Sequence, residues 1–458
     1  MNVTAIFDVG KTNVKLCLVD VHGEVVWSQS RQNDVVQWGP YPHFDVEGLW
    51  QWLLASLAKA AERFSIATIN VSTHGACAVL VDGDGAPMLP VMDYEFDGVE
   101  DYSERYNAIR PAFSRTFSPE LPQGLNLGRQ LYWLRDMFPE AFGRSEYLLL
   151  YPQYWVYRLS GVAVSEVTSL GCHTDLWCPD HDDYSTMVDV LGVSSKLPPM
   201  ADASEPVGCV TAEVSAQTGM PGNCRVYAGV HDSNASFARH LDAGLTPPFS
   251  VVSTGTWVVT FSAGSELSVL DETKDMLANV NVQGEPLACA RFMGGREYGE
   301  ICRLAGTEID SLFEEGDIAE LVNTQSIITP AFSDAGGPFM GAIGQLPDRI
   351  GNGNALATLY LALMIDYELD LLCARGDIVF GSSSTKNPAL CSLLAQLRPG
   401  QRVRVSGDVA STVLGAWAVT RGDFPACEQS VGYSVATATE IPGLLEYRDK
   451  WRAVLPRN

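Results

Sequence analysis

The sequence has few basic residues and no run of them. Its 30 lysines and arginines stand against 55 aspartates and glutamates, which gives a formal charge of −25 at pH 7. Nucleic-acid binding depends on basic side chains that neutralise phosphates, so this balance argues against it. The excess of negative charge also repels an anionic substrate at long range. It favours a neutral substrate, together with a nucleotide whose charge is shielded by a metal ion.

The sequence also lacks the signals of disulfide-rich, metal-binding, secreted and membrane proteins. Its 11 cysteines include no CxxC pair and no Cys/His cluster at metal spacing, so we expect them to be reduced and mostly buried. No apolar run approaches the roughly 20 residues that span a bilayer. The N-terminal stretch has no basic leader and is interrupted by Asp8 and Lys11, unlike a signal peptide. These absences predict a soluble, cytoplasmic protein.

The patterns that are present repeat across two halves of the chain. Residues 1–30 contain three strand-like segments, VTAIFDV, VKLCLVD and EVVWSQS, with the polar turn GKTN between the first two. A second half begins near residues 241–250 with SVVSTGTWVVTFSAG, again two strands around a small hydroxyl-rich turn. Strands alternate with helices in both halves, which predicts a two-domain α/β protein with domains 1–243 and 244–458. Asn126 is predicted to cap the helix that follows it.

Three glycine- and hydroxyl-rich turns are candidates for holding phosphate: GKTN at 10–13, STGT at 253–256 and GSSS at 381–384. Glycine lets the backbone approach phosphate oxygens, and hydroxyls donate hydrogen bonds to them. None of the three is a Walker A loop or a dinucleotide fingerprint. Each one alone is more typical of an ordinary turn.

Two aspartates follow predicted strands and have two interpretations each. Asp8 ends the first strand beside GKTN, where it either holds Mg²⁺ or stabilises the turn. Asp232 follows RVYAGV and opens a helix, where it either caps the helix or accepts a proton from a hydroxyl group. Local spacing does not decide between these interpretations.

Taken in order, these segments resemble the motifs of the FGGY carbohydrate kinases over nearly the whole chain. The resemblance is carried by DVGKTNVKL, VSAQTGMPGNCRVYAGVHDSNASF, STGTW, GSSSTKNPALCSLLA and DVASTVLGAWAVTRG. It implies an α/β fold with two actin-like (ribonuclease-H-like) domains around a central cleft. It also implies that the first domain binds mainly sugar and the second mainly ATP, with Mg²⁺ as the metal ion. The resemblance does not decide whether the protein forms a homodimer.

The resemblance also implies a role for each matching residue. Asp232 is the expected catalytic base, and Asp8 the expected Mg²⁺ ligand. The positions implied to bind ATP or its phosphates are Gly10, Thr12, Asn13, Thr254, Gly255, Thr256, Gly295, Ser383, Ser384 and Asn387. The positions implied to bind sugar are Thr73, His74, Gly75, Asp93, Glu95, His231 and Asp232.

Within the family, the sequence looks most like the rhamnulokinase branch, because of His231-Asp232-Ser233 and the STGTW segment. That branch implies a 6-deoxyketohexose such as L-rhamnulose or L-fuculose. His74 is closer to the xylulokinase pattern, which keeps a pentulose kinase (xylulose or ribulose) as an alternative. Two further departures are serines in the adenosine loop and SDAGGP at 333–338 in place of the family's G-E-R-x-P segment. A non-kinase actin-like ATPase and a sugar-sensing regulator are the alternatives from other classes.

Overall fold

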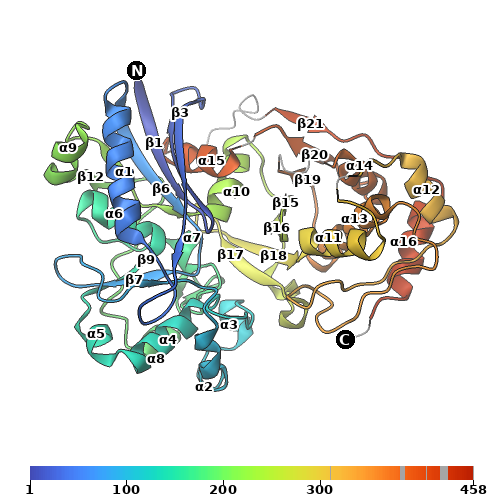
Figure 1. Cartoon of the computed structure of the whole chain (residues 1–458), viewed down its shortest axis with the longest axis horizontal. Coiled ribbons are helices and arrows are strands. Elements are labelled where there is room, and N and C mark those ends of the chain that lie inside the picture. Colours follow the sequence, from blue (N-terminus) through green and yellow to red (C-terminus); the bar gives the residue numbers. More distant parts are fainter. Residues whose placement is uncertain (310, 382–386, 409, 423–431, 457–458) are drawn as a thin grey trace. The chain divides into compact units, whose positions relative to one another are not determined.

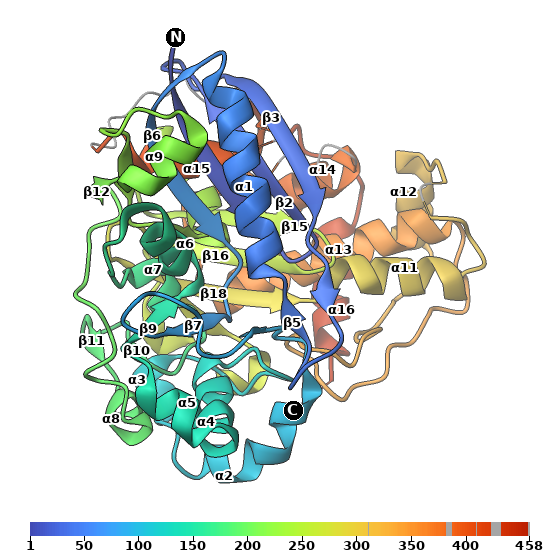
Figure 2. The same cartoon turned by 60° about the vertical axis from the view of Figure 1, so that its left-hand side comes forward.

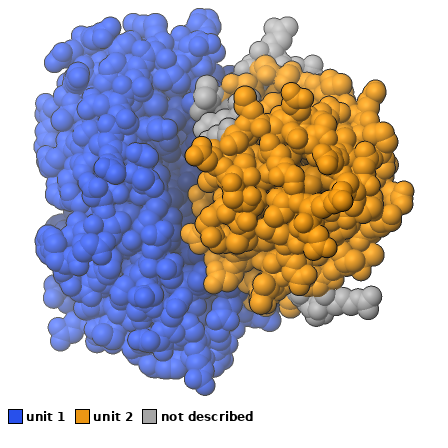
Figure 3. Space-filling model, turned by 45° about the vertical axis from the view of Figure 1, so that its right-hand side comes forward, with its two compact units in different colours: residues 1–245, 278–286, 410–430 blue, residues 246–277, 287–409, 431–458 orange. Residues whose placement is uncertain are grey.

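The computed structural model describes residues 1–458 except 310, 382–386, 409, 423–431 and 457–458. The chain forms two compact units, which Figure 3 colours separately. Unit 1 contains residues 1–245, 278–286 and 410–430; unit 2 contains 246–277, 287–409 and 431–458. Two segments from the second half of the chain therefore belong to unit 1. The functional division at 243/244 stays a prediction.

Unit 1 is built on a sheet with the order β12-β13-β6-β1-β2-β3, and β14 pairs with β6 beside β13. The first three strands, which the sequence predicts, pair in antiparallel fashion. β6 runs parallel to β1, and both β13 and β14 run parallel to β6. The strands are β1 (Asn2–Val9), β2 (Asn13–Val19), β3 (Val25–Gln32), β6 (Ser65–Thr73), β12 (Pro206–Cys209), β13 (Arg225–Tyr227) and β14 (Val230–His231).

Helices cover both faces of this sheet (Figure 1, Figure 2). On one face, the apolar residues of α1 (Val46–Ala61) and α6 (Tyr151–Ser160) share a core with Ile69 and Val71 of β6. Asn70 lies between those two residues, so its side chain points to the opposite face. There its Nδ2 donates to the Ala416 carbonyl, 2.9 Å away. Ala416 lies on α15 (Ser411–Val419), which packs with α10 (Asp232–Asp242) on this second face.

The close approach of α10 and α15 depends on a glycine. A Cβ atom at Gly415 would lie 1.7 Å from the Ala235 carbonyl oxygen, so no larger residue fits without moving a helix. Asp242 at the end of α10 pairs with Arg421 just after α15, at 3.0 Å. These contacts explain why residues 410–422 belong to unit 1 although they lie late in the chain.

The rest of unit 1 is a set of short elements, many of which pack in a second hydrophobic core. Phe44 and Val214 instead belong to the core of the main sheet. The strands are β4 (Val35–Val36), β5 (His43–Phe44), β7 (Ala78–Val81), β8 (Val91–Met92), β9 (Tyr147–Leu150), β10 (Trp177–Cys178) and β11 (Asp183–Tyr184). The helices are the 3₁₀ helix η1 (Asp97–Tyr102), α2 (Ser103–Asn107), α3 (Phe113–Thr116), α4 (Leu127–Met137), α5 (Pro139–Arg144), α7 (Val167–Leu170), α8 (Met187–Leu191) and α9 (Ala212–Thr218).

Unit 2 repeats the topology of unit 1. From β18 to β21 its sheet has the order β18-β16-β15-β19-β20-β21. β15, β16 and β18 are antiparallel, β19 and β20 follow in parallel, and β21 is antiparallel at the edge. The strands are β15 (Phe249–Thr254), β16 (Val258–Ala263), β18 (Pro286–Phe292), β19 (Asp377–Phe380), β20 (Val403–Ser406) and β21 (Tyr433–Val435). Each unit thus has an actin-like (ribonuclease-H-like) sheet, and the predicted α/β class is confirmed.

The core of unit 2 forms around α13 (Gly353–Leu371), which is buried on all sides. The apolar stretch ATLYLALMIDYELDLLCA at 357–374 predicts a buried helix at this place. The remaining elements of the chain are β17 (Leu277–Val280), η2 (Leu267–Val269), η3 (Glu272–Lys274), α11 (Gly294–Leu304), α12 (Glu315–Asn323), α14 (Pro388–Leu397) and α16 (Leu444–Ala453). Among the residues that the structure describes, no helix is both long enough and apolar enough to cross a bilayer.

Candidate active site

Three predicted site residues lie at the carboxyl ends of neighbouring strands in unit 1. Asp8 pairs with Ser72 of β6, and Val230 of β14 pairs with the same residue from the other side. Asp232 comes directly after β14, and His74 directly after β6. Ligands of open α/β sheets bind at this edge. The topology therefore brings Asp8, His74 and Asp232 together from positions far apart in the sequence.

Asp232 is the first residue of α10, and the N-cap position belongs to His231. The carboxylate is therefore not the N-cap of its helix. Its Oδ1 lies 3.3 Å from His231 Nε2 and 3.1 Å from the Ser233 hydroxyl, which donates to it. Burial raises the pKa of Asp232 above its usual value, while the charge of His74 and the hydrogen bonds from Ser233 act in the opposite direction. The side chain is 30 % exposed, so a ligand can reach it.

The ring of His231 is held in one orientation. Asn234, three residues along the same helix, donates from Nδ2 to His231 Nδ1 at 3.1 Å. Burial lowers the pKa of His231 to about 4, so the ring is neutral at pH 7. With Nδ1 accepting, the proton of the neutral ring is on Nε2, which faces the Asp232 carboxylate. Asn234 was not predicted, although its i+3 spacing from His231 places both on one helix face.

Asp8 is destabilised as an anion. Burial raises its pKa to about 7, repulsion from Asp232 adds to the increase, and Lys15 opposes it. No group of three or more His, Cys, Asp or Glu side chains among the described residues is arranged as a metal site. A Mg²⁺ ion that arrives with a nucleotide needs only one or two carboxylates, because phosphates and water complete its octahedral shell. Asp8 and Asp232 fit that requirement, since a cation would relieve their mutual repulsion.

The predicted sugar residues Asp93 and Glu95 share one cation, which the sequence did not identify. The Lys11 ammonium donates to Asp93 Oδ1 and lies 3.3 Å from Glu95 Oε2. It also lies 4.9 Å from the centre of the Tyr94 ring and 5.1 Å from that of Phe44. No sequence pattern signals this pair, because Lys11 and Asp93 are 82 residues apart.

The Thr73-His74-Gly75 segment is packed against this cluster. Thr73 donates its hydroxyl to the His74 carbonyl at 2.8 Å. His74 Nδ1 lies 2.9 Å from the Gly75 carbonyl, and its Nε2 is buried without a partner. A Cβ atom at Gly75 would lie 3.0 Å from His231 Nε2, so glycine lets the His231 ring pack close to the backbone at this position. Contact of Thr73, His74 and Gly75 with sugar stays a prediction.

The first predicted phosphate turn is tight and well supported. The Gly10 amide donates to the Asn13 carbonyl at 2.9 Å and closes the turn. Asn33 donates from Nδ2 to the Gly10 carbonyl and from its backbone to the Thr12 carbonyl, both at 2.8 Å. Thr12 and Asn13 are exposed, so their side chains remain available to a ligand. The supporting role of Asn33 was not predicted, because it lies outside the motif.

The second predicted phosphate turn, Thr254-Gly255-Thr256, lies in unit 2 between β15 and β16, in the place that GKTN occupies in unit 1. The structure brings Gly295 to this turn. A Cβ atom at Gly295 would lie 2.2 Å from the Gly255 carbonyl oxygen, and its amide donates to the Thr256 carbonyl at 3.2 Å. The turn therefore lies against the N-terminus of α11, where helix amides and the helix dipole favour anions.

A chain of contacts ties this turn to the SDAGGP segment. The Arg291 guanidinium lies 4.5 Å from the centre of the Trp257 ring. Its Nε and Nη2 donate to Asp275 at 3.1 and 3.0 Å. Asp275 also accepts the amide of Gly337 at 3.0 Å. Gly336 has a φ of +94°, and a Cβ there would lie 2.8 Å from Trp257. The glycines of SDAGGP therefore let this segment pack against the phosphate turn.

The predicted adenosine loop lies largely outside the described residues, including Ser383 and Ser384. Asn387, at its end, is described. Its Nδ2 donates to the Thr358 hydroxyl at 2.9 Å, and its Oδ1 accepts the Leu390 amide at the start of α14. The side chain thus supports α14, and its contact with a nucleotide stays a prediction.

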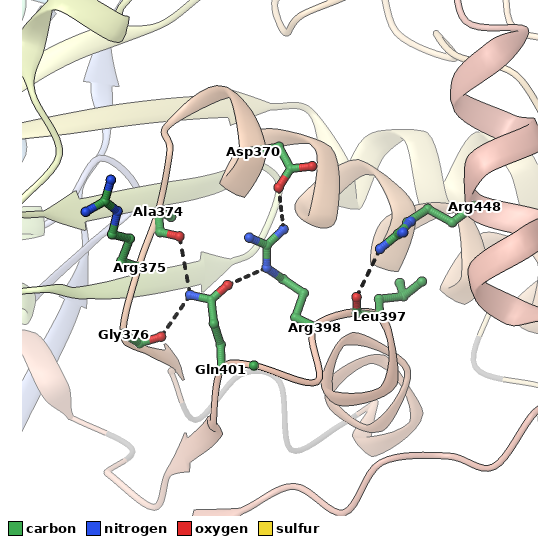
Figure 4. Close-up of a pocket in the computed structure, with 9 residues that line it drawn as sticks. Asp370, Ala374, Arg375, Gly376, Leu397, Arg398, Gln401 and Arg448 are labelled. Atoms are coloured by element: carbon green, nitrogen blue, oxygen red, sulfur yellow. Dashed lines mark hydrogen bonds and ion pairs between the residues drawn. The ribbon is translucent and has the colours of Figure 1, made fainter.

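A surface cavity of about 430 Å³ occurs in unit 2, and no predicted site residue lines it (Figure 4). Its central guanidinium already has protein partners: Arg398 donates to Asp370 at 2.8 Å and to Gln401 at 2.6 Å. Arg448 donates to the Leu397 carbonyl at 3.1 Å. We therefore assign no substrate to this cavity.

Two family models match successive parts of the chain. The model described as "FGGY family of carbohydrate kinases, N-terminal domain" matches residues 3–238. The model described as "Carbohydrate kinase FGGY, C-terminal domain" matches residues 246–429.

Curated relatives match part of the chain at low identity. An L-fuculokinase of Salmonella typhi is 25% identical over 268 residues, which are 56% of this chain and 56% of that protein. A probable L-xylulose kinase of Pasteurella multocida is 25% identical over 278 residues, or 57% of this chain and 55% of that protein. The matched region thus spans about half the length of these curated relatives.

Solved structures match over the whole chain. A carbohydrate kinase from Novosphingobium aromaticivorans is 31% identical, with 98% of this chain and 97% of that chain covered and a TM-score of 0.89. A ligand-bound xylulose kinase from Lactobacillus acidophilus is 16% identical, with 99% and 98% covered and a TM-score of 0.80. At this identity, the similarity to the xylulose kinase shows a shared fold alone.

Proposed function

Because the chain belongs to the FGGY family of carbohydrate kinases, we propose that it transfers the terminal phosphoryl group of ATP to a hydroxyl group of a neutral sugar. The observation that carries this proposal is the Asp232 carboxylate, which is reachable, has a raised pKa and lies 3.3 Å from Nε2 of an oriented neutral histidine. A carboxylate in that state is suited to accept a proton from an alcohol.

The proposed mechanism assigns a limited task to each group. Asp232 accepts the proton of the attacking hydroxyl, and His231, whose Nε2 lies 3.3 Å from Oδ1, packs beside the carboxylate. Phosphoryl transfer needs mainly positioning and charge stabilisation, which in unit 1 the turn 10–13 provides with backbone amides and hydroxyls. Asp8 would hold Mg²⁺, which supplies positive charge to the phosphates when it is bound.

The charges in unit 1 support a neutral acceptor. Four carboxylates belong to the site, namely Asp8, Asp93, Glu95 and Asp232, and Lys11 is already paired with two of them. A sugar with a carboxylate or phosphate would meet net negative charge at these four groups. We therefore propose a neutral ketose as the substrate class.

Among neutral ketoses we propose a 6-deoxyketohexose, such as L-fuculose or L-rhamnulose, phosphorylated on a primary hydroxyl. The resemblance of the His231–Ser233 segment and the L-fuculokinase relatives support this choice. The L-xylulose kinase relative and His74 support the pentulose alternative. One methyl group discriminates by only about 1–3 kcal/mol in an apolar pocket, so we expect some activity on both groups.

The test is a coupled assay of ADP release from MgATP with a panel of ketoses, aldoses, polyols and acidic sugars. We expect release that depends on a neutral ketose, with little or no ATPase activity in its absence. The Asp232→Asn variant serves as the control. Equal rates with and without every sugar would instead support an actin-like ATPase, and sugar binding without turnover would support a sensor. A preference for glycerol or for an acidic sugar would also contradict the proposal.

A further inference from the structure

The backbone that leads to Asp232 is held by buried side chains rather than by a continuous strand. The pairing of β13 and β14 with β6 is interrupted at Ala228 and Gly229. Gln153 donates from Nε2 to both carbonyls of this break, at 2.9 and 3.0 Å, and Asn70 Oδ1 accepts the Gly229 amide at 3.2 Å. Gln153 and Asn70 are fully buried. The position of Asp232 therefore depends on the side chains that contact the segment before it.

The last backbone amide before Asp232 belongs to His231, and its partner is a side chain of another element. Thr168 of α7 accepts this amide at Oγ1, 3.0 Å away. His231 is the N-cap of α10, and in a capping box the side chain three residues later would satisfy its amide. That residue, Asn234, instead donates to the ring of His231. Thr168 thus does from outside the helix what a capping box would do within it.

Glu166 orients the Thr168 hydroxyl. Thr168 donates from Oγ1 to Glu166 Oε2 at 2.6 Å, so the lone pairs of the hydroxyl remain for the His231 amide. The Glu166 carboxylate also accepts the amides of Thr168 and Ser169, at 3.0 and 3.3 Å. Glu166 and Thr168 are both fully buried, and burial raises the pKa of Glu166 to about 7 although these hydrogen bonds oppose the increase. A buried carboxylate is costly, and glutamate is not among the preferred N-caps of a helix.

From these contacts we infer that Glu166 and Thr168 are positioning residues for the catalytic base: Glu166 orients the Thr168 hydroxyl, which fixes the backbone that carries the Asp232 carboxylate. Both act through the amide of His231 rather than on the substrate itself. This inference rests on the proposed function, in which Asp232 accepts the proton of the sugar hydroxyl. The base must lie within hydrogen-bond reach of that hydroxyl. A misplacement of about 1 Å can cost on the order of 10²-fold in rate.

The first test replaces Thr168 by valine, which keeps the shape of the side chain and removes the hydroxyl. We expect Thr168→Val to lower kcat about 10–100-fold, with KM for ATP little changed. Thr168→Ser keeps the hydroxyl and should restore most of the lost kcat. The matched control is Thr218→Val in α9, because Thr218 is also buried and its hydroxyl also donates one hydrogen bond and accepts one. This control should lower Tm and leave kcat unchanged.

The second test repeats Thr168→Val in the Asp232→Asn background. The effects of residues that act as a unit are not additive, so the loss of the hydroxyl should cost no further kcat once the base is gone. Glu166→Gln keeps the size of the side chain but turns an amide group towards the Thr168 hydroxyl. It should also lower kcat, and this effect should also disappear in the Asp232→Asn background. Glu166→Gln provides the same measurement if Thr168→Val does not fold.

The outcomes separate this inference from the proposed function. If Thr168→Val lowers kcat by the same factor with and without Asp232, or if Thr218→Val lowers it equally, the role of Thr168 is merely structural and the kinase proposal stands. An unchanged kcat in both Thr168→Val and Glu166→Gln, or a rise in KM for ATP in place of the fall in kcat, would overturn the inference as well. If the wild-type enzyme phosphorylates no sugar, the proposed function fails and the inference fails with it.

Discussion

Replacing Asp8 by asparagine should stabilise the protein in the absence of nucleotide, and increasingly so as the pH rises. Burial and Asp232 raise the pKa of Asp8 from its ordinary 3.8 to about 7. The folded state therefore holds a proton that the unfolded state has lost, and stability falls as the pH rises from about 4 to about 7. At 1.36 kcal/mol per pKa unit, the full difference is about 4 kcal/mol. Water screens the partly exposed side chain, so we expect about 2–4 kcal/mol above pH 7.

The Asp8→Asn substitution would keep the shape of the side chain, and the new amide could donate to the Asp232 carboxylate. Scanning calorimetry at pH 5, 7 and 8.5 measures the effect, which corresponds to an increase in Tm of about 3–7 °C at pH 8.5. The gap between variant and wild type should shrink at pH 5. Asp34→Asn, at an exposed aspartate of the same unit, is the control. A gap of the same size at all three pH values would refute the reasoning.

Three further predictions concern the same site and its supports. Asp232→Asn should lower kcat by about 10²–10⁴-fold with the fold intact. A near-normal kcat would show that Asp232 is not the catalytic base. Gly415→Ala should lower Tm in calorimetry by several degrees, because its Cβ would lie 1.7 Å from a backbone oxygen. The control is Gly143→Ala, which should leave Tm unchanged because the added Cβ meets no other atom there. Arg291→Met should raise KM for ATP on the order of tenfold, because Trp257 beside the second phosphate turn would lose its contact with the guanidinium. An equal rise in KM for sugar would contradict this prediction.

Local patterns in the sequence were sufficient for the elements and their order. The alternation of apolar residues predicted the strands β1, β2 and β3, and the long apolar stretch predicted α13, because both patterns repeat within one element. The hairpin around Thr254–Thr256 was predicted for the same reason. The ordered motifs also indicated the family, which the match of both family models confirms.

Side-chain roles were harder to predict even where the element was right. Asn126 does occupy the N-cap position of α4, yet its side chain makes no capping bond. Its Oδ1 accepts the Leu121 amide at 2.8 Å and its Nδ2 donates to the Pro119 carbonyl at 3.0 Å. The preference of asparagine for this position was thus a correct guide to the helix start, while the bonds that use the side chain come from the preceding loop.

The sequence by itself determined the hairpin at the start of each half, the long buried helix α13 and the residue types available for chemistry, since these depend on neighbours along the chain. Only the tertiary structure decided which of those residues meet. Lys11 reaches Asp93 across 82 positions, and α15 joins unit 1 through Gly415 although it lies late in the chain. The pKa of Asp8 is raised first by burial and then by Asp232, which the order of strands in the sheet brings near it. Such contacts depend on strand order and burial, which no local pattern of residues encodes.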